Sequence, residues 1–125
     1  MINTTAFAFT AYPVTDLTRA RAFYEGLLGL QPATAWEGAG KGWIEYELGD
    51  ACLAITNSSG DQWKPSASGP ALALEVADFP AAVAALRAAQ TKFAVEPMEF
   101  PPCHFAAVLD PDGNQLIIHH KKARA

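Results

Sequence analysis

The sequence predicts an α+β fold in which two βαβββ modules form one domain. The chain has 125 residues, of which 50% are hydrophobic, so it can fill one core but not two independent ones. A strand, an acidic helix cap, a helix and further extended runs occur twice, with Asp16 and Asp78 at matching places. We therefore expect one domain over residues 1–125, with module 1 at about 4–57, a linker at 58–69 and module 2 at about 70–121.

The first module begins with a strand predicted over residues 6–11. Asp16 follows as a helix N-cap, and Gly29 ends the helix as a left-handed C-cap would. Between them lies an apolar stripe at helical spacing: Leu17, Ala20, Phe23, Tyr24, Leu27 and Leu28.

A hairpin is predicted to complete the first module. After Pro32 comes a loop or short strand, and then two extended runs at 42–48 and 51–57 flank the turn residues Gly49 and Asp50. Apolar and polar residues alternate along the first of these runs. This pattern gives one face to a core and the other to more polar surroundings.

The second module repeats this order. A strand is predicted at 71–76, and Asp78 caps a helix with an apolar stripe. Three extended runs follow at about 93–98, 103–109 and 115–120, and the turn residues 110–114 join the last two. The helical stripe comprises Phe79, Ala82, Val83, Leu86 and Ala89.

We expect the helices to pack on the outside of the sheets, which leaves the inner sheet faces to form a cleft. The period-2 pattern assigns the following residues to the cleft: Phe7, Phe9, Trp43, Glu45, Glu47, Cys52, Ala54, Thr56, Ala71, Ala73, Glu75, Gln115, Ile117 and His119. A five-residue connection at 110–114 would add Cys103, Phe105 and Ala107 and turn His104 away. A different length would reverse that assignment.

Charge and cysteine usage narrow the class of partners. The net charge is -4, and the basic residues cluster only in the tail, at Lys121, Lys122 and Arg124, so we expect neither nucleic acid nor a membrane as partner. The N-terminal residues lack the pattern of a signal peptide, and no apolar run reaches the roughly 20 residues that span a bilayer. We expect a cytoplasmic protein in which Cys52 and Cys103 are reduced thiols.

Four short motifs resemble those of the vicinal oxygen chelate superfamily. They are VTDL at 14–17, RAFYE at 21–25, LGL at 28–30 and DPDGN at 110–114. This superfamily includes glyoxalase I, bleomycin-resistance proteins and extradiol dioxygenases. The resemblance covers nearly the whole chain and implies the paired-module fold, and it also implies a homodimer. It does not choose among the chemistries that this scaffold supports.

The resemblance also points to the places where metal ligands would stand. In metal-dependent members, His, Gln or Glu ligands come from the first and last strands of each module, at positions that align with Phe9, Ala54, Ala71 and Ile117. Apolar side chains offer neither lone pairs nor charge to a divalent ion. We therefore expect no metal cofactor and a likeness to the metal-free branch, whose bleomycin-resistance members bind and sequester a ligand.

The expected cleft suits a flat or apolar small molecule. Phe7, Phe9, Trp43 and Phe105 would form aromatic walls, and alanines on the same surface leave room. Glu45, Ile117 and His119 complete the predicted ligand-binding set, with Glu45 and His119 as polar anchors. The leading hypothesis is a metal-independent protein that binds a small molecule.

Two other functional hypotheses are also consistent with the sequence. The chain could be a lyase or isomerase in which His119, with Glu45 or Glu75, forms a displaced metal site or an acid/base pair. Cys103 could serve as a nucleophile if a histidine lowered its pKa, although a buried free cysteine is the commoner case. Alternatively, the protein's own side chains could fill the cleft, and the role would then be structural or one of protein interaction.

Overall fold

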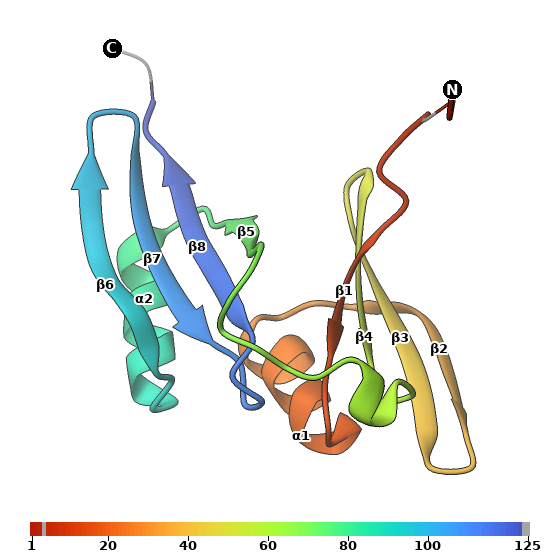
Figure 1. Ribbon diagram of the computed structural model, residues 1–125. Coiled ribbons are helices and arrows are strands. Elements are labelled where there is room, and N and C mark those ends of the chain that lie inside the picture. Colours follow the sequence, from red (N-terminus) through yellow and green to blue (C-terminus); the bar gives the residue numbers. More distant parts are fainter. Residues whose placement is uncertain (4, 124–125) are drawn as a thin grey trace. The chain divides into compact units, whose positions relative to one another are not determined.

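The computed structural model describes all residues except 4, 124 and 125, so Arg124 of the predicted basic tail lies outside the described residues. The chain divides into two compact units, Met1–Pro65 (unit 1) and Ser66–Ala125 (unit 2), which are drawn in Figure 1. Each unit holds one four-stranded sheet.

Unit 1 contains a mixed sheet with strand order β1-β4-β3-β2. Strand β1 runs parallel to β4, and the other neighbours are antiparallel. In chain order the elements are β1 (Thr10–Pro13), α1 (Leu17–Arg21), the π-helical turn η1 (Ala22–Leu27), β2 (Pro32–Gly38), β3 (Lys41–Leu48), β4 (Ala51–Thr56) and the 3₁₀ turn η2 (Gly60–Gln62).

Unit 2 repeats this topology with strand order β5-β8-β7-β6, in which β5 and β8 are parallel. Its elements are β5 (Leu72–Glu75), α2 (Phe79–Ala88), β6 (Phe93–Phe100), β7 (Cys103–Leu109) and β8 (Gln115–Lys121). The identical strand order in both units confirms the predicted α+β class and the two βαβββ modules.

Both predicted helix caps are present. Asp16 Oδ1 accepts a hydrogen bond from the Arg19 backbone N–H at 3.1 Å, and Asp78 Oδ1 accepts one from that of Ala81 at 3.0 Å. Each bond satisfies a backbone donor that the first helical turn leaves open. Gly29, with φ of 75°, follows the first helix in the left-handed conformation that glycine adopts without strain.

The two turns that set the strand registers also match the sequence prediction. Leu48 pairs with Ala51, so Gly49 and Asp50 form a two-residue turn. Leu109 pairs with Gln115 across the five-residue connection at 110–114. Within that connection the buried Asp110 side chain accepts bonds from the backbone N–H groups of residues 112 and 114, each at 2.9 Å.

The first strand begins later than predicted. Parallel pairing to β4 starts at Thr10 and includes Pro13, so residues 6–9 precede the strand. Proline is tolerated here because β1 is an edge strand, whose outward side needs no backbone N–H. In module 2, Ala71 and Val76 likewise fall just outside β5.

Burial differs from the sequence pattern at four residues. Leu48 is 38% exposed, because it stands beside the Gly49 turn where the sheet ends. Ala89 is exposed because it follows the last residue of α2 as its C-cap. Ala54 and Thr56 are buried although they alternate with core residues, since β4 is a central strand with neighbours on both sides.

A partly buried polar network joins the first helix to the sheet of unit 1. Arg21 Nε donates to Glu25 Oε2 at 2.6 Å, and the Tyr46 hydroxyl donates to the same oxygen at 2.8 Å. Burial of Glu25 opposes its ionisation, but the bonds from Arg21 and Tyr46 outweigh it and hold the Glu25 pKa below its usual range. The Tyr46 bond joins the π-helical turn to β3.

Candidate functional site

Each sheet has one face that packs on a helix. In unit 1 the ring of Tyr46 on β3 stacks on Tyr24 of η1 at 6.2 Å, and in unit 2 His104 on β7 stacks on Phe79 of α2 at 5.3 Å. We call the opposite side of each sheet its far face. It carries Trp43, Glu45, Glu47, Cys52 and Ala54 in unit 1, and Ala73, Glu75, Cys103, Phe105, Ala107, Ile117 and His119 in unit 2.

On the far face of unit 1, aromatic rings surround a carboxylate. The Trp43 indole N–H donates to Glu45 Oε2 at 2.8 Å. Phe9 meets the Trp43 ring edge-on at 5.3 Å, although Phe9 precedes β1. Glu45 pairs across the ladder with Ala54, as the two-residue turn requires, and Ala54 is fully buried. Glu45 is therefore a half-buried carboxylate that lies beside aromatic rings and has a small alanine as its cross-strand neighbour.

A shallow hollow of about 350 Å³ lies at the turn end of this sheet. Phe7 and Phe9 line it together with Cys52 from β4. Phe7 itself is fully exposed and Phe9 is 51% exposed, so these rings offer apolar surface to a partner molecule.

On the far face of unit 2, a histidine is held by a carboxylate. His119 Nδ1 lies 2.6 Å from Glu75 Oε1, its parallel neighbour on β5. The Lys121 backbone N–H donates to the other oxygen, Glu75 Oε2, at 2.6 Å. The hydrogen bond from His119, followed by that from Lys121, lowers the pKa of Glu75. Glu75 therefore stays ionised and anchors the imidazole.

Beside the His119–Glu75 pair, the far face of unit 2 carries small apolar side chains. Ile117 lies between Ala73 on β5 and Ala107 on β7, so small side chains flank it on both sides. Phe105 pairs directly with His119 and meets Phe100 edge-on at 6.4 Å. The rings of Phe100 and Phe105 therefore project from the sheet at one end of a surface formed by short side chains.

The other histidines lie on the helix side. His104 pairs with His120, and His120 Nδ1 donates to the Val76 carbonyl at 2.7 Å. The five-residue connection therefore places Cys103, and not His104, on the far face. His119 and His120 are adjacent on β8 and face opposite sides of the sheet, so the two side chains cannot bind one ion from the same face.

The two cysteines are free thiols. Burial, followed by the charges of Glu45 and Glu47, raises the pKa of Cys52 and keeps that thiol protonated. Cys103 pairs with Lys121, two residue pairs along the ladder from the Phe105–His119 pair and on the same face.

The four positions aligned with metal ligands do not suit a metal. Ala54 is buried in β4, Ile117 lies on β8, and Phe9 and Ala71 each precede the first strand of their unit. None of these side chains has a donor atom for a divalent ion. Elsewhere in the described part of the chain, no three His, Cys, Asp or Glu side chains gather closely enough to hold one.

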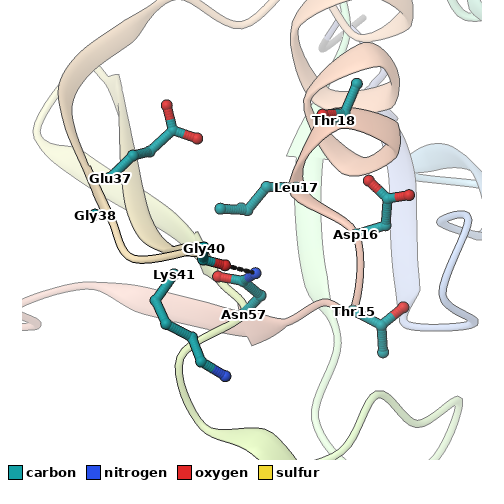
Figure 2. A pocket seen from close by; sticks show the side chains of 9 residues that line it. All are labelled: Thr15, Asp16, Leu17, Thr18, Glu37, Gly38, Gly40, Lys41 and Asn57. Carbon is teal, nitrogen blue, oxygen red and sulfur yellow. Dashed lines mark hydrogen bonds between the residues drawn. The ribbon is translucent and has the colours of Figure 1, made fainter.

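A second hollow in unit 1, of about 370 Å³, lies near the start of α1 and the β2–β3 turn, on the helix side. Figure 2 shows Leu17 directed into it, with the Glu37 carboxylate at one side and the Lys41 side chain directed away. The Asn57 side-chain amide donates to the Gly40 carbonyl at 3.0 Å and braces the turn. This hollow is polar and lies apart from the predicted ligand-binding residues.

Of the two acidic partners considered for His119, the structure brings Glu75 to it. Glu45 belongs to unit 1 and His119 to unit 2. The sequence signal for this pairing is the register of the parallel strands β5 and β8. Ala73 pairs with Ile117, so Glu75, two residues after Ala73, pairs with His119, two residues after Ile117. Sequence reasoning also missed the Trp43–Glu45 bond, which joins residues on one strand face.

No helix among the described residues is long and apolar enough to cross a membrane.

Comparisons with known structures return the same fold throughout the chain. TnmS3, an antibiotic-binding protein from a Streptomyces species, is 20% identical with a TM-score of 0.76, covering 98% of this chain and 100% of that one. A lactoylglutathione lyase from Agrobacterium tumefaciens is 18% identical with a TM-score of 0.68, covering 94% of each chain. The fosfomycin resistance protein FosX from Listeria monocytogenes is 10% identical with a TM-score of 0.75, covering 96% of each chain.

No curated protein matches the sequence. One family model does, over residues 6–118, and it describes the glyoxalase/bleomycin resistance protein/dioxygenase superfamily. The match includes both repeated modules and the DPDGN connection that precedes β8. The chain therefore belongs to the glyoxalase/bleomycin resistance protein/dioxygenase superfamily.

Proposed function

We propose that this protein binds a small, partly apolar molecule without the help of a metal ion. The observation that carries the proposal is that each far face pairs aromatic side chains with one polar group held by a neighbour. In unit 1, Trp43 holds Glu45 through Oε2, which leaves Oε1 for a ligand. In unit 2, Glu75 holds His119 through Nδ1, which leaves Nε2.

Preorganised polar groups favour binding because no side-chain freedom is lost when the ligand arrives. Aromatic rings and short side chains supply the apolar contact that such ligands need. The description of TnmS3 as an antibiotic-binding protein agrees with a binding role.

The independence from metal rests on the donor chemistry of Phe9, Ala54, Ala71 and Ile117. Side chains without lone pairs cannot complete a divalent site at those positions. No step of the proposed binding therefore requires an ion.

The test uses Trp43 as a reporter. The chain has three tryptophans, so a Trp36→Phe/Trp63→Phe variant leaves Trp43 alone. Titration with 2-naphthol or 2-methoxynaphthalene should change its fluorescence saturably, with the same Kd in EDTA. A linear response, or a Kd that depends on added metal, would contradict the proposal.

Variants separate the two far faces. Glu45→Gln should weaken binding if unit 1 contacts the probe, and Glu47→Gln is its control because Glu47 is exposed on the same strand face nearer the turn. His119→Phe tests unit 2, and Lys121→Met, two residues along β8, is its control. A loss on both control substitutions would indicate a non-specific charge effect.

The His119–Glu75 pair favours a second candidate, a metal-free acid/base enzyme. A carboxylate that fixes an imidazole is the arrangement by which histidine moves protons in many active sites. The Agrobacterium relative is described as a lactoylglutathione lyase, so formation of lactoylglutathione in EDTA is the activity to assay first. Turnover that His119→Ala abolishes would establish this candidate. Binding of the naphthalene probes with no turnover would favour sequestration.

We also propose that the protein is a cytoplasmic homodimer. Strand β2 is an edge strand whose residues are nearly all exposed, and its Trp36 is 59% exposed. Exposed edges and large apolar side chains are commonly covered by a partner. Sedimentation equilibrium should give twice the chain mass, and fluorescence microscopy of a tagged chain should place it in the cytoplasm.

A further inference from the structure

The contacts of Glu75 determine where the proton of His119 lies. An ionised carboxylate accepts hydrogen bonds and cannot donate them. Glu75 Oε1 lies 2.6 Å from His119 Nδ1, so the hydrogen between them belongs to Nδ1. In the neutral imidazole the other nitrogen, Nε2, then carries a lone pair and no hydrogen.

We infer that Glu75 is a positioning residue that fixes His119 as the Nδ1–H tautomer, so that the ligand group meeting Nε2 is a hydroxyl donor such as a phenol. This inference rests on the proposed function, because it names the chemistry of the ligand held there. An ether or carbonyl oxygen at the same place would face a lone pair and lose the bond.

Among the described neighbours of His119, Glu75 is the one whose hydrogen bond to Nδ1 sets the tautomer. The neighbour across β7 is Phe105, whose ring has no hydrogen-bonding atom. His104 and His120 lie on the helix side of the sheet. The backbone N–H of Lys121 points to Glu75 Oε2 and so keeps the carboxylate in place.

Replacing Glu75 by glutamine should reverse the tautomer. The amide has one accepting oxygen and one donating nitrogen. The Lys121 backbone N–H, which donates to Glu75 at 2.6 Å, requires an acceptor and would take the oxygen. The amide nitrogen then faces His119 Nδ1 and donates to it, which moves the imidazole hydrogen to Nε2. Because Glu75 is exposed, this change should leave the fold intact.

The tautomer can be read without any ligand. Long-range ¹H–¹⁵N spectra of the full chain, recorded at about pH 8.5 where an ordinary histidine is neutral, distinguish the two imidazole nitrogens. We expect hydrogen on Nδ1 in the wild type and on Nε2 in Glu75→Gln. Hydrogen on Nε2 in the wild type, or the same tautomer in both proteins, would overturn the inference.

Ligand preference provides the second arm. The probes 2-naphthol and 2-methoxynaphthalene differ in whether their oxygen can donate. One hydrogen bond corresponds to a preference of about five- to tenfold for the naphthol in the wild type. Glu75→Gln should abolish or reverse this preference. Glu99→Gln should keep it, since Glu99 is a carboxylate of the same unit that pairs with Lys122.

The failures of the two proposals are distinguishable. Equal affinity of both probes for the wild type, or a preference that survives Glu75→Gln, would overturn the inference while leaving small-molecule binding in place. Absence of binding by either probe would count against the proposed function, and the tautomer spectra would then decide the role of Glu75 alone.

Discussion

The hydroxyl of Tyr46 offers a sensitive test of how unit 1 is held together. Tyr46 is fully buried, and its hydroxyl donates to Glu25 Oε2 at 2.8 Å. Tyr46→Phe removes this oxygen and keeps the ring that stacks on Tyr24. The substitution therefore reports on one hydrogen bond with little change in packing.

The expected cost follows from the charge on the acceptor. A hydrogen bond to an ionised group stabilises a fold by about 1.5–3 kcal/mol. The Glu25 side chain is 25% exposed and keeps its bond from Arg21 at 2.6 Å, so water and Arg21 compensate part of the loss. We expect Tyr46→Phe to lower the free energy of unfolding by about 1.5–2 kcal/mol at pH 7.

The cost should depend on pH in a defined direction. The pKa of Glu25 is lowered in the folded state, so its contribution to stability is complete above an ordinary carboxyl pKa of about 4.3 and is lost as pH falls through the lowered value. Once Glu25 is protonated, a neutral hydrogen bond of about 1 kcal/mol remains. Urea unfolding between pH 7 and acid conditions measures this decline.

A double-mutant cycle with Glu25→Gln isolates the interaction. Tyr46→Phe should cost about 1 kcal/mol less in the Glu25→Gln background than in the wild type, because the charge is already absent. A cost that is the same at every pH and undiminished in Glu25→Gln would refute the assignment of the Tyr46 bond to an ionised Glu25.

Three further predictions concern packing, the connection before β8, and thiol reactivity. A Cβ on Gly42 would lie 2.6 Å from a side-chain carbon and 3.1 Å from a backbone oxygen, so Gly42→Ala should destabilise the protein by about 1–3 kcal/mol in urea unfolding, whereas Gly26→Ala, with nothing within 4 Å, should not. Asp110→Asn replaces a buried accepting oxygen by a donor and should cost about 2–3 kcal/mol, measured in the same way. Because a raised pKa keeps Cys52 protonated at pH 7, Glu47→Gln should speed its reaction with a thiol reagent, and an unchanged rate would exclude the charge effect.

Most of the fold could be predicted from local signals. Asp16 and Asp78 mark both helix starts, and Gly49 with Asp50 sets the β3–β4 register. The β2–β3 turn was not recognised, because Ala39 adopts a positive φ of 55° that sequence rules reserve for glycine or asparagine. Helix propensities do not predict the π-helical turn, because the turn is stabilised by the hydrogen bond between Glu25 and Tyr46 of β3.

The sequence predicts on which face of the sheet each site residue lies, but not which side chain it forms a hydrogen bond with. Period-2 alternation placed Glu45 and His119 on the far faces, and the length of the 110–114 connection decided between Cys103 and His104. Alternation cannot specify which side chains bond, because that depends on strand register and rotamer. The pairing of Glu75 with His119 needed the register of parallel strands β5 and β8.

Metal analysis tests the central proposal most directly. Protein purified without added metal, and then titrated with nickel, zinc, manganese and iron, should hold no tight stoichiometric ion, while the Trp43 reporter still binds 2-naphthol. The chemical reason is that Phe9, Ala54, Ala71 and Ile117 offer no ligand atoms. One tightly bound ion per chain, lost on His119→Ala, would contradict the account and establish a displaced metal site.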